Sequence, residues 1–218
     1  MGTANSGSFI GFRGKVGGLV CYTLKGKTVL RSVGYSSKPP SQKQLAQYQQ
    51  MRVLNAFLKP MLGFINIGFA TAVAGTDRNA YNEAFSINKR HALQGEYPDV
   101  SVDHSKAVVS MGDLPVPTDL SVTTAASGER VDFSWSMAAD MEWVNRNDRA
   151  MLLLYFPSVN GAEENGESLF VLSGARRADG QDYMELPLSY RNRPMVAWLA
   201  FIADNRNAVS NSVFSEVT

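Results

Sequence analysis

The sequence predicts an α+β protein in which an N-terminal β-hairpin and helices precede a seven-stranded antiparallel β-sandwich. Three observations lead to this class. Two β-rich runs flank a short glycine turn near the N-terminus, apolar residues recur at helical spacing over residues 45–61, and strand-like runs fill residues 119–217. With 218 residues, 44% of them hydrophobic, and a formal net charge of +1, the chain has the composition of a folded protein.

The first predicted element is a hairpin formed by residues 16–24 and 28–33. Both runs are rich in β-branched and apolar residues, and the turn between them, Lys25-Gly26-Lys27, contains a glycine that can take a positive φ. Further glycines at positions 11, 14, 17 and 18 indicate a bent strand or a close backbone contact.

A helix is expected to begin at Ser41. Its hydroxyl can accept from the free amides of the first turn while Gln44 reaches back, as in a capping box. Pro60 should interrupt this helix near Phe57. Apolar residues at spacings of three or four form one stripe on it, namely Leu45, Tyr48, Met51, Leu54, Leu58 and Met61.

Two more helices are expected before the sandwich. Residues 61–74 form an apolar run that falls short of the roughly 20 residues needed to span a bilayer, so it reads as a buried helix. Residues 77–93 form the other, with cations near its C-terminal end. Short strands are expected over 98–102 and 106–111, followed by a proline-marked linker over 113–118.

On this basis the chain divides into a basic hairpin-and-helix region, residues 1–112, and a sandwich, residues 113–218. Regular alternation of apolar and polar residues begins after the linker. Seven runs separated by Gly, Asn, Asp and Ser turns are the signature of a sandwich, and they cover residues 120–123, 131–136, 149–156, 168–172, 182–186, 195–203 and 208–214.

The C-terminal region resembles fibronectin type III and immunoglobulin-like domains. The resemblance lies in the proline-rich start, in Val131-Asp-Phe-Ser-Trp135 with its tryptophan on the second strand, and in the run from Trp198 to Ser212 for the last two strands. The long loop over residues 138–147 departs from that pattern. The resemblance implies a domain that binds a partner or forms part of a structure, and that does not catalyse a reaction.

The chain as a whole is similar to an uncharacterised bacterial family of domain-of-unknown-function proteins. The similarity is carried by Gly14-Lys-Val-Gly17, by Lys25-Gly-Lys-Thr-Val-Leu-Arg31, by Pro40-Ser-Gln42 followed by Gln49-Gln50, and by Ala208-Val-Ser-Asn-Ser212. It implies no activity and therefore assigns no functional residues.

The near-neutral total hides an uneven distribution of charge. The first 76 residues hold nine lysines and arginines and no acidic residue, whereas residues 77–218 hold 12 basic and 20 acidic residues. Such an asymmetry is typical of contact with nucleic acid, an anionic surface or an acidic partner. Two other interpretations stay open: the two parts neutralise each other within one molecule, or the basic end of one copy meets the acidic end of the next.

Motifs that resemble active or metal sites do not have the spacing that such sites need. Gly26-Lys27-Thr28 ends like a phosphate-binding loop, but the position of the first glycine is occupied by Cys21 and both flanks are strand-like. Cys21 lies in an alternating run and reads as a packed thiol rather than a nucleophile. The acidic groups that could gather around a cation lack ligand spacing, namely Asp99, Asp103 and Asp113 with His104, and Glu163, Glu164 and Glu167.

No catalytic, cofactor-binding or metal-binding residue is therefore predicted, and an enzyme is not expected. The sequence favours a structural or adaptor protein that acts through contacts with another protein or with itself. The hairpin offers strand edges and cations, and Trp143 lies in a long loop where it can anchor a partner. The candidate partner-binding residues are Lys15, Lys25, Lys27, Arg31, Lys38 and Trp143.

The alternative is a nucleic-acid-binding protein that uses the basic N-terminal region. In that case Lys43 joins the lysines and arginines above in neutralising phosphates, and Tyr22 or Tyr35 stacks on bases. No membrane partner is expected. The chain has one cysteine, and its N-terminus shows no apolar run typical of a secretory signal, so a cytoplasmic location is predicted.

Overall fold

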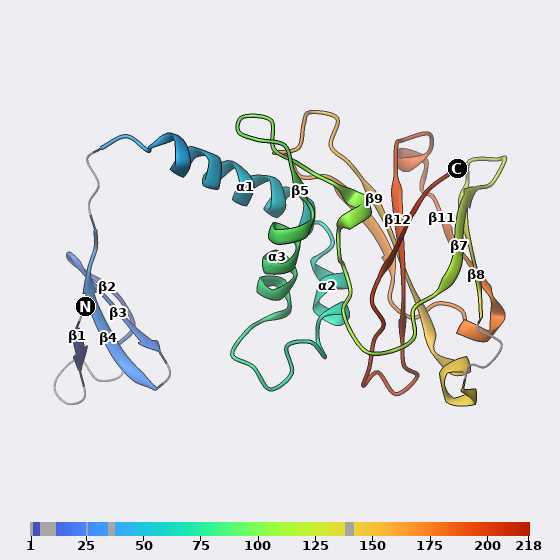
Figure 1. Ribbon diagram of the computed structural model, residues 1–218, viewed down its shortest axis with the longest axis horizontal. Helices are drawn as coiled ribbons and strands as arrows, with labels where there is room; N and C mark the ends of the chain where they lie inside the picture. The colour runs from blue at the N-terminus through green and yellow to red at the C-terminus, as the bar shows by residue number, and fades with distance from the viewer. Residues whose placement is uncertain (1, 5–11, 25, 35–37, 138–141) are drawn as a thin grey trace. The chain divides into compact units, whose positions relative to one another are not determined.

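The computed structural model describes residues 2–4, 12–24, 26–34, 38–137 and 142–218. Contacts between residues divide the chain into two compact units, Met1–Ser41 and Gln42–Thr218. The described residues contain three helices and many antiparallel strands, so the predicted α+β class with an N-terminal hairpin is confirmed (Figure 1).

The first unit is a four-stranded antiparallel sheet with the order β1-β4-β3-β2. Its strands are β1 (Gly2–Ala4), β2 (Gly14–Val16), β3 (Leu19–Leu24) and β4 (Lys27–Ser32). The predicted hairpin is β3 with β4, and Gly26 between them has a φ of 76°. The run expected as one strand over 16–24 is in fact broken, because Gly17 takes a φ of 55° and turns the chain between β2 and β3.

The second unit begins with three helices, α1 (Gln42–Leu58), α2 (Leu62–Gly68) and α3 (Ala80–His91). Helix α1 ends two residues before Pro60, which disfavours helical conformation in the residue that precedes it. The apolar stripe predicted on α1 is buried only in its second half, since Tyr48 and Met51 are 54% and 44% exposed. Helix α3 begins where the side chain of Asn79 accepts a hydrogen bond from the backbone N–H of Asn82.

The segment between α3 and the sheets differs from its prediction. It contains β5 (Leu93–Gln94) paired with β6 (Ser101–Val102) and a short 3-10 helix, η1 (His104–Lys106). Residues 106–111, expected as a strand, form none. Side chains take the place of a neighbouring strand there: the N–H of Val108 donates to Asn88 and the N–H of Val109 donates to Ser212.

Residues 118–216 form seven main strands in two antiparallel sheets. One sheet has the order β11-β8-β7 and the other the order β10-β9-β12-β13. The strands are β7 (Thr118–Thr124), β8 (Arg130–Ser136), β9 (Arg149–Phe156), β10 (Glu167–Val171), β11 (Gln181–Glu185), β12 (Val196–Ile202) and β13 (Val213–Glu216). A kinship of this pair of sheets with fibronectin type III domains stays a prediction.

Strands β9 and β12 are buried on both faces, which sets the layering of the second unit. Alternate residues such as Leu152 and Phe201 belong to a core shared with β8 and β11, whereas Leu153 and Trp198 belong to a second core shared with the helices. Figure 1 shows the resulting order, with α2 and α3 on one side of β9 and β12, and β7, β8 and β11 on the other.

This layering disagrees with the domain division that the sequence predicts between residues 112 and 113. The structure divides the chain after Ser41 instead, and the helices belong to the same unit as both sheets. The physical reason is that Phe57, Met61 and Phe64 pack in one core with residues of β9 and β12. Separating the helices at residue 112 would expose that core to water.

Candidate functional site

The register of the N-terminal sheet gathers three cations and a tyrosine on one face, here called the basic face: Lys15, Tyr22, Lys27 and Arg31. Lys15 and Arg31 both lie opposite Val20, and Lys27 lies opposite Leu24. Because side chains alternate along a strand, residues 20, 22 and 24 of β3 point to the same side. The guanidinium carbon of Arg31 lies 6.0 Å from the centroid of the Tyr22 ring.

The opposite face of this sheet carries an apolar group, Val16, Leu19, Cys21 and Leu30, together with Thr23, Thr28 and Ser32, all aligned by the same register. Val16 and Leu19 are 53% and 41% exposed, while Cys21 is buried. A buried thiol behaves as a small apolar side chain, in agreement with the packed role expected for Cys21.

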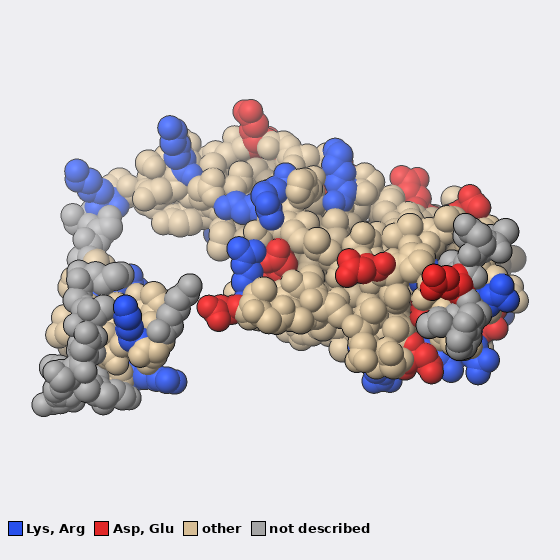
Figure 2. All heavy atoms as spheres, turned by 60° about the horizontal axis from the view of Figure 1, so that its bottom comes forward, with Lys and Arg blue, Asp and Glu red and all other residues tan. Residues whose placement is uncertain are grey.

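Charge on the first unit has one sign. Residues 1–41 contain six lysines and arginines and no aspartate or glutamate, whereas residues 42–218 contain 15 basic and 20 acidic residues. Figure 2 shows Lys and Arg as the charged side chains on the described residues of this sheet, and a mixture of both signs on the larger unit. Within this unit, therefore, no acidic residue offsets the positive potential of the basic face.

The other residues predicted to bind a partner are placed differently. Lys25 and Tyr35 lie outside the described residues. Lys38 is exposed just before α1, and Lys43 is exposed in its first turn. Trp143 begins a 3-10 helix, η2 (Trp143–Asn147), and its side chain is also outside the described part of the structure. Of the six predicted residues, the structure thus brings together Lys15, Lys27 and Arg31.

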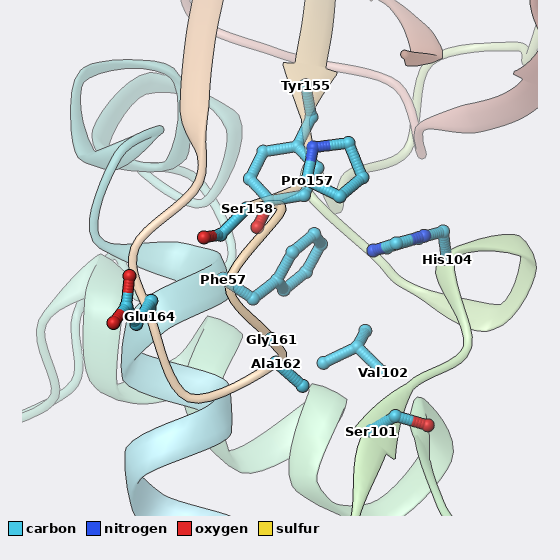
Figure 3. Close-up of a pocket in the computed structure, with 10 residues that line it drawn as sticks. All are labelled: Phe57, Ser101, Val102, His104, Tyr155, Pro157, Ser158, Gly161, Ala162 and Glu164. Atoms are coloured by element: carbon cyan, nitrogen blue, oxygen red, sulfur yellow. The ribbon is translucent and has the colours of Figure 1, made fainter. Parts of the chain in front are cut away.

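A second site was not predicted from the sequence. A cavity of about 180 Å³ opens between α1, η1 and the loop that follows β9 (Figure 3). Figure 3 shows the rings of Phe57 and His104 pointing toward one another at this cavity. Its lining residues are Phe57, Ser101, Val102, His104, Tyr155, Pro157, Ser158, Gly161, Ala162 and Glu164.

Aromatic side chains surround the imidazole of His104. Its ring centroid lies 5.5 Å from that of Phe57, 5.6 Å from that of Tyr155 and 6.3 Å from that of Trp198. Burial lowers the pKa of His104, against the opposing effect of the neighbouring Asp103 carboxylate. Burial likewise raises the pKa of Tyr155 to about 12. Both groups are therefore neutral at pH 7.

The loop that closes the cavity is fixed to α1 by polar contacts. The carboxylate of Glu163 accepts from the guanidinium of Arg52 and from the side-chain amide of Gln49, the latter at 2.9 Å. These hydrogen bonds lower the pKa of Glu163. The amide of Gln49 also donates to the carbonyl of Pro98, so one helical residue ties together two loops.

Sequence reasoning missed this cavity because its residues come from three separated segments, near residue 57, over 101–104 and over 155–164. From the sequence alone, His104 belongs with Asp99, Asp103 and Asp113, a group that lacks the spacing of a cation site. Within the described ranges, no three His, Cys, Asp or Glu side chains are grouped to hold a metal ion. No helix in the same ranges has both the length and the apolar character to cross a bilayer.

Comparison with known proteins identifies one family. A family model described as a family of unknown function (DUF6266) matches residues 11–216. No curated protein matches the sequence. The similarity to a domain-of-unknown-function family is therefore confirmed, while a bacterial origin and a kinship with immunoglobulin-like domains stay predictions.

Proposed function

Since the chain belongs to the DUF6266 family of unknown function, its role has to come from its own residues, and we propose that it is a non-enzymatic structural or adaptor protein. It acts through protein contacts made by the N-terminal sheet. The observation that carries this proposal is the basic face of Lys15, Tyr22, Lys27 and Arg31 on a sheet that contains no acidic residue.

Apolar exposure on the same unit supports a protein partner. Five large apolar side chains of this small sheet and its flanks are between 40% and 53% exposed, namely Phe12, Val16, Leu19, Leu24 and Val33. Exposed apolar residues next to cations are typical of a surface that another protein covers. The sheet also has a short edge strand, β2, at which a further strand can add.

The partner that complements this surface is an acidic protein, which includes a second copy of this chain. Residues 42–218 carry five more acidic than basic residues, opposite in sign to the N-terminal sheet. A contact of this kind between copies is heterologous, so it leads to head-to-tail assembly. The single cysteine needs no oxidising compartment, which fits a cytoplasmic location.

Light scattering coupled to size exclusion tests this proposal on the full chain at low and high salt. We expect association that weakens as salt screens the charges. The double variant Lys15→Glu and Arg31→Glu should abolish the association, whereas Lys59→Glu, an exposed charge reversal outside the sheet, should preserve it. Two results together contradict the proposal. The first is a strictly monomeric particle at high protein concentration. The second is that the double variant captures an acidic partner as well as the unaltered protein does.

Nucleic acid is the second candidate partner, because Tyr22 lies between cations on the basic face. An aromatic ring flanked by cations is the usual arrangement for single strands, where bases stack and phosphates pair with lysine or arginine. Fluorescence anisotropy with a single-stranded oligonucleotide measures this directly. Three phosphate contacts predict a slope of log K against log salt of about −2, and absence of binding at low salt rules this candidate out.

A further inference from the structure

We propose that the cavity between α1, η1 and the β9–β10 loop binds a small neutral aromatic molecule that carries a hydroxyl group, such as a phenol. Its volume of about 180 Å³ is the first argument. An engineered apolar cavity of about 150 Å³ is large enough for benzene. The space next to His104 therefore accepts a single substituted ring and excludes larger ring systems.

The walls of the cavity suit a flat apolar ligand. Phe57 and Tyr155 are held edge to face, with centroids 5.1 Å apart and an interplanar angle of 83°. Val102, Pro157 and Ala162 add apolar surface to the lining, to which Ser101 and Ser158 also belong. Aromatic pairs in this geometry present both ring edges and ring faces, so an aromatic ligand continues a packing pattern that is already formed.

His104 supplies the specificity for a hydroxyl. Within the described part of the chain, neither imidazole nitrogen has a hydrogen-bond partner in the protein, and neither is among the buried polar atoms that lack one, so both stay accessible beside the aromatic side chains. A neutral imidazole has one N–H donor and one acceptor nitrogen. A hydroxyl can either donate or accept, so it can take the place of water at an imidazole nitrogen to which no other protein group is hydrogen-bonded.

The charges around the cavity favour a neutral ligand. The carboxylate of Glu164 lies at the exposed rim and repels anions. That carboxylate already accepts from the side-chain amide of Asn160 at 3.0 Å, and its exposure to water weakens its attraction for cations. A cation would also lose its hydration beside a neutral imidazole.

The site is built before any ligand arrives. The Glu163 contacts with Arg52 and Gln49 hold the loop wall against α1. All of these residues belong to the unit Gln42–Thr218. A test of ligand binding at this cavity is therefore independent of the proposed role of the N-terminal sheet.

Titration of the full chain with phenol, toluene and benzylammonium, followed through NMR signals of labelled histidine, tests the proposal. We expect phenol to shift the signals of His104 and not those of His91, which does not line this cavity. Phenol should bind with a dissociation constant of about 1 mM or tighter, and toluene about tenfold more weakly because it lacks the hydrogen bond.

Three variants separate a specific site from general packing. His104→Phe keeps an aromatic ring and removes the hydrogen bond, so phenol should bind it only as tightly as toluene does. Ala162→Phe should fill the cavity and abolish binding of both. Val159→Ser is the control, because Val159 is 87% exposed on the same loop and does not line the cavity.

Three results would overturn the proposal. The first is the absence of any shift at His104 up to the solubility limit of phenol and toluene. The second is equal affinity of the unaltered protein for phenol and toluene, which would mean that His104 does not select a hydroxyl. The third is tighter binding of benzylammonium than of phenol, which would identify a site for cations.

Discussion

The guanidinium of Arg177 and the carboxylate of Asp148 form an ion pair that is almost fully buried. The Nη2–Oδ2 distance is 2.9 Å, the side chains are 1% and 3% exposed, and the guanidinium carbon lies 3.8 Å from the centroid of the Phe201 ring. Burial raises the pKa of Asp148, and the charge of Arg177 opposes that rise. The pair is therefore costly to desolvate, and each partner depends on the other.

Asp148→Ala should lower the free energy of unfolding by about 3–5 kcal/mol, because it leaves the Arg177 charge buried without its counter-ion. Chemical denaturation with urea measures this loss. A double variant, Asp148→Leu with Arg177→Met, removes both charges and should recover most of the stability. A loss below about 1 kcal/mol for Asp148→Ala would show that water reaches the pair.

His104 predicts a dependence of stability on pH. Burial lowers its pKa in the folded protein below the ordinary value of 6.5, so the unfolded chain binds the proton more readily. The contribution of neutral His104 is thus fully present above about pH 6.5 and is lost as the pH falls through the folded pKa. The slope for one proton is at most about 1.4 kcal/mol per pH unit.

Unfolding in urea at several pH values between 7 and 5 tests this point. The unaltered protein should lose stability across this window, and His104→Phe should show a flatter profile there. Below this window the profiles of both proteins should fall, because the lowered pKa of Glu163 makes its hydrogen bonds to Arg52 and Gln49 sensitive to acid. If the stability profiles of the unaltered protein and of His104→Phe run parallel between pH 7 and 5, the assignment of this pH dependence to His104 is contradicted.

At the scale of elements, α3 organises a segment that has no strand partner. The side chain of Asn88 is completely buried, and it accepts from the N–H of Val108 and donates to the carbonyl of the same residue at 2.7 Å. A single amide thus replaces the two hydrogen bonds that a neighbouring strand would make. This arrangement lets residues 107–110 pack against the core without a sheet.

Asn88→Ala should destabilise the protein by about 2–4 kcal/mol, because two backbone groups of Val108 lose their partners in a buried setting. Thermal unfolding followed by circular dichroism measures the effect. Asn82→Ala is the matched control, since Asn82 lies on the exposed face of the same helix. Equal stability of the two variants would show that water replaces the amide of Asn88.

On the scale of the whole molecule, the two faces of β9 and β12 join the helices and both sheets into one cooperative unit. The helix core contains Leu153 and Trp198, and the core between the sheets contains Leu152 and Leu199 from the same two strands. Removing the helices from one face would leave the middle sheet half exposed. Helices and sheets of residues 42–218 should therefore unfold together.

The test compares the helical signal in far-ultraviolet circular dichroism with tryptophan fluorescence during thermal unfolding. The two transitions should coincide, and Asp148→Ala should lower both midpoints equally even though the pair lies away from the helices. Two separate transitions would mean that the helices form an independent domain, as a boundary at residue 112 implies.

Much of the fold was predictable where local chemistry decides it. Alternation of apolar and polar residues predicted β8 almost to its ends, Gly26 predicted the β3–β4 turn, and Pro60 predicted the end of α1. The basic face was predicted in part, because Lys15, Lys27 and Arg31 were chosen on charge while their alignment needed the strand register. In each case the deciding interactions span only a few residues or one hairpin.

The difference between the predicted boundary after residue 112 and the contact-based division after Ser41 had a signal in the sequence. Residues 150–156 and 196–202 are apolar throughout, so the alternation expected after the linker does not extend to them, and a strand without alternation is one that is covered on both faces. That pattern indicated a third layer next to the two sheets, but it did not say which segment supplies it. The helices fill that place, because their apolar residues pack in one core with β9 and β12.

By itself, the sequence determined the secondary-structure class, the turns, the segregation of charge and the family to which the chain belongs. Only the tertiary structure decided which face of a strand meets which neighbour. It alone brought Phe57, His104 and Tyr155 to one cavity and paired Arg177 with Asp148. The physical reason is that local propensity acts over a few residues, whereas burial is settled by contacts between segments that are distant in the chain.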